Sequence, residues 1–167
     1  MYGDGKGVPK DEARAIEFLG RTCELAPSNK DVEPSDPGLV DAKSACSMAG
    51  VAYSGGMGGK KDPAKAIAAW QHGCDQADEA ACDLLLSHLL GTDGFPKDAG
   101  RAAALEPKVC ASTPELPACA WLAAMYADGD GVKKDPKKAR EMMSRACAKA
   151  SKAECDALRD LGKNRPK

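Results

Sequence analysis

The chain has 167 residues, which fits one domain by length, and apolar residues make up 43% of it. Lys and Arg number 24 against 25 Asp and Glu, so the formal net charge is −1, and no basic run marks a nucleic-acid or polybasic membrane surface. Aromatic residues make up only 4%, so the composition disfavours β-sheets and favours closely packed, Ala-rich helices.

A recurring Lys-Asp pair reveals an internal repeat. The four aspartates are spaced 51, 36 and 37 residues apart, and an Ala follows each of them at the fourth position. Glycine-rich loop residues precede each pair, and a Tyr or Leu lies nine residues before each Asp. These columns are Asp11, Asp62, Asp98 and Asp135; Ala15, Ala66, Ala102 and Ala139; and Tyr2, Tyr53, Leu89 and Tyr126. Several independent columns agree, so a degenerate repeat of about 36 residues organises the chain.

Each repeat predicts a first helix (helix A), a glycine-rich loop and a second helix (helix B). The Asp caps helix B, because its carboxylate can accept from free N–H groups of the first turn. Pro63 and Pro136 follow at the first helical position, where proline is tolerated, and the glycines allow the preceding helix to end. In chain order we expect helices at about 12–23, 42–54, 63–75, 79–90, 99–110, 117–127, 136–149 and 152–161.

We therefore expect one all-α solenoid domain over residues 1–167. It comprises a partial repeat at 1–23, an insertion loop at 24–45, repeats at 44–75, 80–110 and 117–149, and a capping helix at 152–161. Because Tyr2 aligns with Tyr126, the chain opens at the end of an A helix. We expect the natural chain to extend upstream of Met1; the alternative is a repeat that is naturally truncated.

The insertion loop is about 15 residues longer than the other links between repeats. It carries Pro27, Pro34 and Pro37 together with Asp31, Glu33, Asp36 and Asp41. A long loop is either functional or merely tolerated, since closing a longer loop costs little extra. We favour tolerance, and expect a surface loop that can be shortened to the common length without loss of folding.

All eight cysteines occupy two repeat columns, one at the end of helix B and one in the first turns of the next helix A. An antiparallel helix pair brings these columns together, so we expect the disulfides Cys23–Cys46, Cys74–Cys82, Cys110–Cys119 and Cys147–Cys155. The chain-entropy model assigns about 2.6 kcal/mol to each short loop and about 3.4 kcal/mol to the longer one. The alternative is that each cysteine is a small apolar core residue.

No metal or other cofactor is expected. Zinc sites use C-x2-4-C spacings, and neither His72 nor His88 is placed in the sequence to complete one. Disulfides imply an oxidising compartment, so we expect a periplasmic or secreted protein. No secretory signal opens the chain, so we expect that signal to precede Met1. The apolar stretches, such as Ala118 to Ala127, are far too short to span a membrane.

The fourth repeat resembles a known motif. Its residues Cys119, Leu122, Tyr126, Gly129, Gly131, Val132, Lys134, Asp135, Lys138, Ala139, Ala146 and Cys147 resemble the Sel-one-like repeat (SLR), a relative of the tetratricopeptide repeat. The paired cysteines resemble the Hcp-type, cysteine-rich secreted SLR proteins of bacteria. The resemblance implies a right-handed superhelix of α/α pairs whose concave face is lined by A helices, and adaptor-like binding of a protein or peptide. The third repeat departs from the motif at Leu86, Leu89 and Thr92.

Some cysteine-rich members of that family have been labelled penicillin-binding or β-lactamase-like. The chain contains no S-x-x-K, S-D-N or K-T-G motif, and it has only two histidines that could act as a general base. The loop Gly55–Lys60 is glycine-rich, but it lacks the phosphate-loop spacing and follows a helix. We therefore expect a monomeric, non-enzymatic scaffold that binds protein or peptide and no nucleic acid. The alternative is a cell-wall-related enzyme or a penicillin-binding or β-lactamase-like activity.

The A helices carry two contrasting faces. Counted from each A-helix Cys, offsets 0, 3, 4 and 7 form a stripe that should face the B helices, and the opposite face is unexpectedly apolar. An exposed apolar patch suggests a partner site. We expect a concave peptide-binding groove lined by Met48, Val51, Leu84, His88, Trp121 and Met125. The alternative, that neighbouring A helices bury these side chains against each other, stays open.

Overall fold

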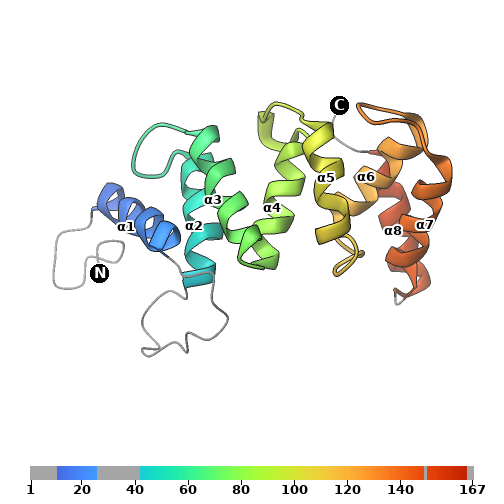
Figure 1. Ribbon diagram of the computed structural model, residues 1–167, viewed down its shortest axis with the longest axis horizontal. Coiled ribbons are helices and arrows are strands. Elements are labelled where there is room, and N and C mark those ends of the chain that lie inside the picture. Colours follow the sequence, from blue (N-terminus) through green and yellow to red (C-terminus); the bar gives the residue numbers. More distant parts are fainter. Residues whose placement is uncertain (1–10, 26–41, 149, 165–167) are drawn as a thin grey trace. The chain divides into compact units, whose positions relative to one another are not determined.

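The computed structural model of the chain describes residues 11–25, 42–148 and 150–164 (Figure 1). Within these residues the chain forms eight α-helices, one 3-10 turn and no strand. They are α1 (Glu12–Leu25), α2 (Ala42–Gly55), α3 (Pro63–Asp75), α4 (Glu79–Leu89), η1 (Thr92–Gly94), α5 (Ala99–Val109), α6 (Pro117–Asp128), α7 (Pro136–Cys147) and α8 (Lys152–Lys163). The predicted all-α fold is confirmed, and each helix ends within two residues of its predicted bounds.

Two sequence predictions lie outside the described residues. One is the end of an A helix near Tyr2, and the other is the insertion loop, of which residues 26–41 are not described. The aspartate caps are confirmed. The carboxylate of each accepts a hydrogen bond from the backbone N–H three residues later, at 2.9–3.0 Å; the caps are Asp11, Asp62, Asp98 and Asp135.

The chain packs as two compact units, the first ending at Leu85 and the second beginning at Leu86, so the boundary lies inside α4. In the first unit, α2 packs against α1 and α3, and α1 also contacts α3. In the second, α6 packs against α5, α7 and α8, and α7 contacts α8. Each unit therefore contains alternating A and B helices, as the repeat predicts, while a single domain over 1–167 stays a prediction.

The stripe of A-helix residues that was predicted to face the B helices forms much of the core. Its members are all buried except Tyr53, which is partly buried; the stripe is Cys46, Ala49, Gly50 and Tyr53; Cys82, Leu85, Leu86 and Leu89; and Cys119, Leu122, Ala123 and Tyr126. In the first unit the stripe meets Trp70 of α3, which is fully buried and donates its indole N–H to the Ser47 carbonyl at 3.2 Å. Burial of this stripe against the B helices holds the repeats together.

Four disulfides join the end of a B helix to the following A helix. They are the predicted pairs Cys23–Cys46, Cys74–Cys82, Cys110–Cys119 and Cys147–Cys155, with Cα–Cα separations of 4.5–5.7 Å. The prediction of a disulfide-stapled repeat is confirmed.

Glycines in the loops between helices A and B permit close packing of successive repeats. Gly58 has φ +68°, and a Cβ at this position would lie 2.9 Å from backbone atoms of Ala13 in α1. Gly131 has φ +70°, and its Cβ would lie 2.6 Å from the Cβ of Ala99 in α5. Both positions therefore require glycine for its backbone conformation and for its small size.

Candidate functional site

The six predicted groove residues divide between the two units. Met48 and Val51 lie on α2 of the first unit and are each 45% exposed, and Leu84 of α4 is partly buried. Met48 and Val51 are three residues apart, so they share one face of the helix. Of the predicted groove, this pair presents the most accessible apolar surface.

In the second unit, His88 and Met125 do not have the exposure that the groove prediction requires. Met125 of α6 is only 1% exposed, and His88 of α4 is 6% exposed. His88 is buried because the third-repeat loop places the ring of Phe95 edge-on against it, with ring centroids 4.5 Å apart. The prediction that these two side chains face an open groove was therefore wrong. Trp121 is partly buried, and its indole nitrogen is enclosed without a hydrogen-bond partner.

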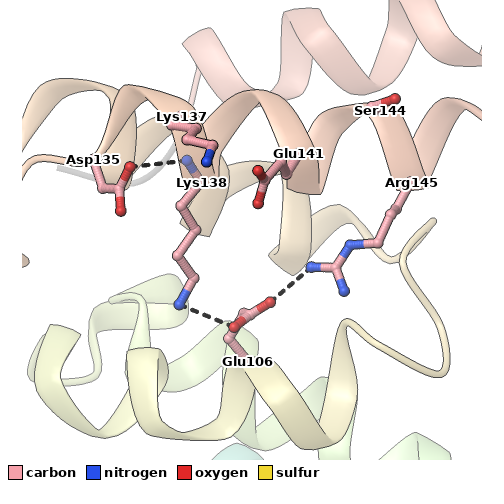
Figure 2. A pocket seen from close by; sticks show the side chains of 7 residues that line it. All are labelled: Glu106, Asp135, Lys137, Lys138, Glu141, Ser144 and Arg145. Atoms are coloured by element: carbon pink, nitrogen blue, oxygen red, sulfur yellow. Dashed lines mark hydrogen bonds and ion pairs between the residues drawn. The ribbon is translucent and has the colours of Figure 1, made fainter.

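A cluster of charged residues lies between α5 and α7 of the second unit, around a hollow of about 750 Å³. Figure 2 shows Lys138 and Arg145 reaching from α7 toward Glu106 on α5. Glu106 Oε2 lies 3.0 Å from Lys138 Nζ, and Glu106 Oε1 lies 2.8 Å from Arg145 Nη2. The Glu106 residue is only 5% exposed, whereas the two cations are partly exposed. A buried carboxylate thus has two cationic partners.

The repeat explains why this carboxylate is unusual. Glu106 lies eight residues after its capping aspartate, and the other repeats carry Leu19, Trp70 and Met143 at that position. A Glu in an otherwise apolar column is the sequence signal for this cluster, although we did not predict the cluster from it. Buried charges occur where they are paired, so the third repeat replaces an apolar contact by an ion-pair contact to the next B helix.

Lys138 is the central cation of the cluster. Its Nζ also donates to the Tyr126 hydroxyl at 3.1 Å and lies 4.4 Å from the centre of that ring. Burial lowers the pKa of Lys138, but hydrogen bonds to Tyr126 and Glu106, and the charge of Glu106, outweigh burial and raise the pKa above 10.5. A cation held in this way stays charged at neutral pH, and its positive charge balances the negative charge of Glu106. The cluster therefore suits helix packing rather than general-base catalysis.

A second group of chemically active residues lies in the first unit. His72 of α3 lies beside the Cys23–Cys46 disulfide, and one ligand atom from each of the three residues lies within 4.8 Å of the others. Cys23 and His72 also line a pocket of about 510 Å³. From the linear spacing, neither histidine was expected to complete a zinc site, yet the fold brings His72 beside one cysteine pair. The reason is that α3 packs against both α1 and α2, which the linear spacing of the residues does not reveal.

Comparison with known proteins identifies the repeat. The family model described as the Sel1 repeat matches residues 1–27, 43–68 and 116–151, which is more than half of the chain. This chain belongs to the Sel1 repeat family. The third repeat lies outside the matched residues, in keeping with its departures at Leu86, Leu89 and Thr92.

One curated protein is similar to this chain in sequence, and two solved structures are similar to it in fold. The chain is 32% identical to cytochrome c oxidase assembly factor 7A of Xenopus laevis over 149 residues, which cover 87% of this chain and 59% of that protein. A Sel1 repeat protein of Oxalobacter formigenes superposes with a TM-score of 0.66 at 21% identity, covering 95% of this chain and 58% of that chain. A protective antigen of uropathogenic Escherichia coli with an SLR fold gives a TM-score of 0.65 at 22% identity, covering 92% of this chain and 30% of that chain. This chain thus spans about three fifths or less of each of these proteins.

The relatives confirm the solenoid repeat as the fold class of this chain. Among the described helices, none is both long enough and apolar enough to cross a membrane.

Proposed function

We propose that this Sel1 repeat chain is a protein- or peptide-binding scaffold that works outside the cytoplasm and binds through the outward face of its A helices. The observation that carries the proposal is the exposed pair Met48 and Val51 on α2, each 45% exposed. The opposite face of the same helix is filled by Cys46 and Ala49, which are fully buried. Helix α2 is therefore apolar on both faces, although packing within the unit needs only one.

The chemistry of the pair suits a protein partner. Isolated apolar residues on a surface need no explanation, whereas neighbouring ones on one helix face favour an interaction site. Met adapts to partners of irregular shape because its side chain is unbranched and flexible. Leu84 and Trp121 remain secondary candidates, since both are partly buried and each has only part of its surface to offer.

Family membership supports the same function. Sel1 repeat proteins are generally interaction scaffolds, and the frog relative is named as an assembly factor. The proposed extracytoplasmic location rests on a different observation. Four disulfides within 167 residues favour an oxidising compartment, because cytosolic thiols are usually kept reduced.

The candidate chemical groups favour a scaffold over a hydrolase. A hydrolase of the β-lactamase type needs an activated serine with a nearby base. His88 is buried against Phe95, and the negative charge of Glu106 is balanced by Lys138 and Arg145, so neither residue is placed to act as that base. Incubation of the oxidised protein with nitrocefin and with a labelled penicillin tests the enzymatic alternative. We expect neither turnover nor labelling.

The scaffold itself is tested by affinity capture from the envelope fraction of the source cell. The bait is the oxidised chain, compared with Met48→Asp/Val51→Asp. The matched control is Met57→Asp, since Met57 is an exposed methionine in the loop after α2 and is 56% exposed. We expect a protein that the wild type and the control retain and that the double variant loses. Identical capture by all three baits would overturn the proposed binding face.

A further inference from the structure

His72 stands where three helices of the first unit meet. Cys23 comes from the end of α1, Cys46 from the second turn of α2, and His72 from the last turn of α3. The two sulfurs and one ring nitrogen lie within 4.8 Å of one another. Among the described residues, no other group of three or more His, Cys, Asp or Glu ligands is this close. Among the described residues, none of the other three disulfides has a third potential ligand this close.

We propose that reduction of the Cys23–Cys46 disulfide converts this junction into a Cys2His site for a thiophilic metal ion, Zn²⁺ in the first instance. The oxidised disulfide is not such a site, because metals bind the thiolate. Two thiolates and one imidazole are a donor set that zinc accepts, with a fourth position open for water. Zinc–sulfur and zinc–nitrogen bonds of about 2.3 Å and 2.0–2.1 Å allow ligand atoms to be spaced by less than 4.8 Å.

The redox step is a two-electron thiol–disulfide exchange. One thiolate of an external dithiol attacks a sulfur of the Cys23–Cys46 bond and forms a mixed disulfide, releasing the other cysteine as a thiolate. The second thiol of the dithiol then displaces the remaining cysteine. The dithiol ends as a disulfide and the protein gains two thiols. Metal binding releases their protons to solvent, so the ion holds the pair in the reduced form.

Two features favour this pair as a metal site. Cys23 and His72 line the pocket of about 510 Å³, which supplies an entry path although Cys23 itself is only 2% exposed. The side chain of Gln76 lies 2.7 Å from Nε2 of His72. A metal on Nδ1 requires Nε2 to carry its proton and donate it, so the Gln76 amide must turn to present its oxygen to the ring before it can orient a ligating His72.

The test uses the full chain and Co²⁺ as a spectroscopic probe. A trialkylphosphine reduces the protein, each disulfide taking up two electrons and two protons while the phosphine takes oxygen from water to become its oxide. After anaerobic removal of the reductant, Co²⁺ is titrated into the protein and then displaced with Zn²⁺. We expect one equivalent of Co²⁺ with a thiolate-to-cobalt charge-transfer band in the reduced chain, and none in the oxidised chain.

His72→Ala is the decisive variant because it keeps all eight cysteines and can be purified oxidised and folded. We expect it to bind Co²⁺ at least about tenfold more weakly, since it loses a direct ligand. His88→Ala and Cys147→Ser/Cys155→Ser should bind like the wild type. A band of equal strength in His72→Ala would overturn the proposal, because it would arise from thiols elsewhere or from an unfolded chain. The absence of any band in the reduced wild type would also overturn it.

Discussion

Gly50 of α2 lies against the indole ring of Trp70 of α3, so closely that a Cβ at position 50 would overlap the ring. Trp70 is fully buried and cannot move into solvent without opening the core of the first unit. We predict that Gly50→Ala destabilises the chain by about 1–3 kcal/mol through overpacking. The matched control is Gly59→Ala, where a Cβ meets nothing within 4 Å. Denaturant unfolding without reductant measures both variants, and equal stability of the two would contradict this packing.

The Glu106 cluster predicts a contrast between two substitutions. Glu106→Ala leaves a cavity and removes the partner of Lys138 and Arg145, so we expect a loss of about 1–3 kcal/mol. Glu106→Leu should lose less than about half as much, because Leu restores the apolar residue that Leu19 provides in the first repeat. The two cations are partly exposed and can turn toward water. Thermal and denaturant unfolding test the order, and a Leu variant as unstable as the Ala variant would contradict it.

The start of α8 predicts a pH dependence. Glu154 accepts a hydrogen bond from the backbone N–H of Ser151 at 2.7 Å, and the Ser151 hydroxyl accepts from the N–H of Glu154 at 3.3 Å. The backbone N–H of Ser151, with a smaller contribution from the Ser151 side chain, lowers the pKa of the Glu154 carboxyl group below 4.5. Because the folded pKa is lowered, the stabilisation is present above the unfolded value and is lost as the pH falls through the folded value.

Glu154→Gln isolates this contribution, since Gln can still accept from Ser151 but does not titrate. We expect the wild type to be more stable than the variant at neutral pH, and the difference to vanish as the pH falls below 4.5. Unfolding curves of both proteins across the acid range measure the difference. A difference that is independent of pH would show that the carboxylate charge does not contribute.

The disulfides predict a simple mass-spectrometric result. Since all eight cysteines are paired in the structure, alkylation of unfolded, unreduced protein should modify no thiol. Proteolysis should then release peptides joined as Cys23–Cys46, Cys74–Cys82, Cys110–Cys119 and Cys147–Cys155. Several alkylated cysteines, or peptides joined across different repeats, would contradict the pairing.

Helices and disulfides were predictable from sequence because their signals are local or periodic. The aspartate caps, the proline at Pro63 and the two cysteine columns each depend on spacing within one repeat. Glu106 was predictable in principle, since it interrupts an apolar column. His72 was not, because its contact with Cys23 depends on how α1 and α3 pack.

The exposure of the individual groove residues could not be predicted from the helical pattern either. A helical offset predicts which residues share a face, but it does not predict what the next element places against that face. Phe95 follows η1 and covers His88, and the sequence pattern contains no sign of that contact. Met48 and Val51 stay exposed on the same predicted face.

The face of α2 that carries Met48 and Val51 is the proposed contact with a protein partner. The most direct test places a photo-crosslinking amino acid at position 48, with position 57 as the control, since both native residues are exposed methionines. Irradiation in the source cell should join position 48 to one defined protein, and the crosslink should disappear when Val51→Asp is added. Crosslinking at position 57 alone, or at position 48 with no change upon Val51→Asp, would contradict the account.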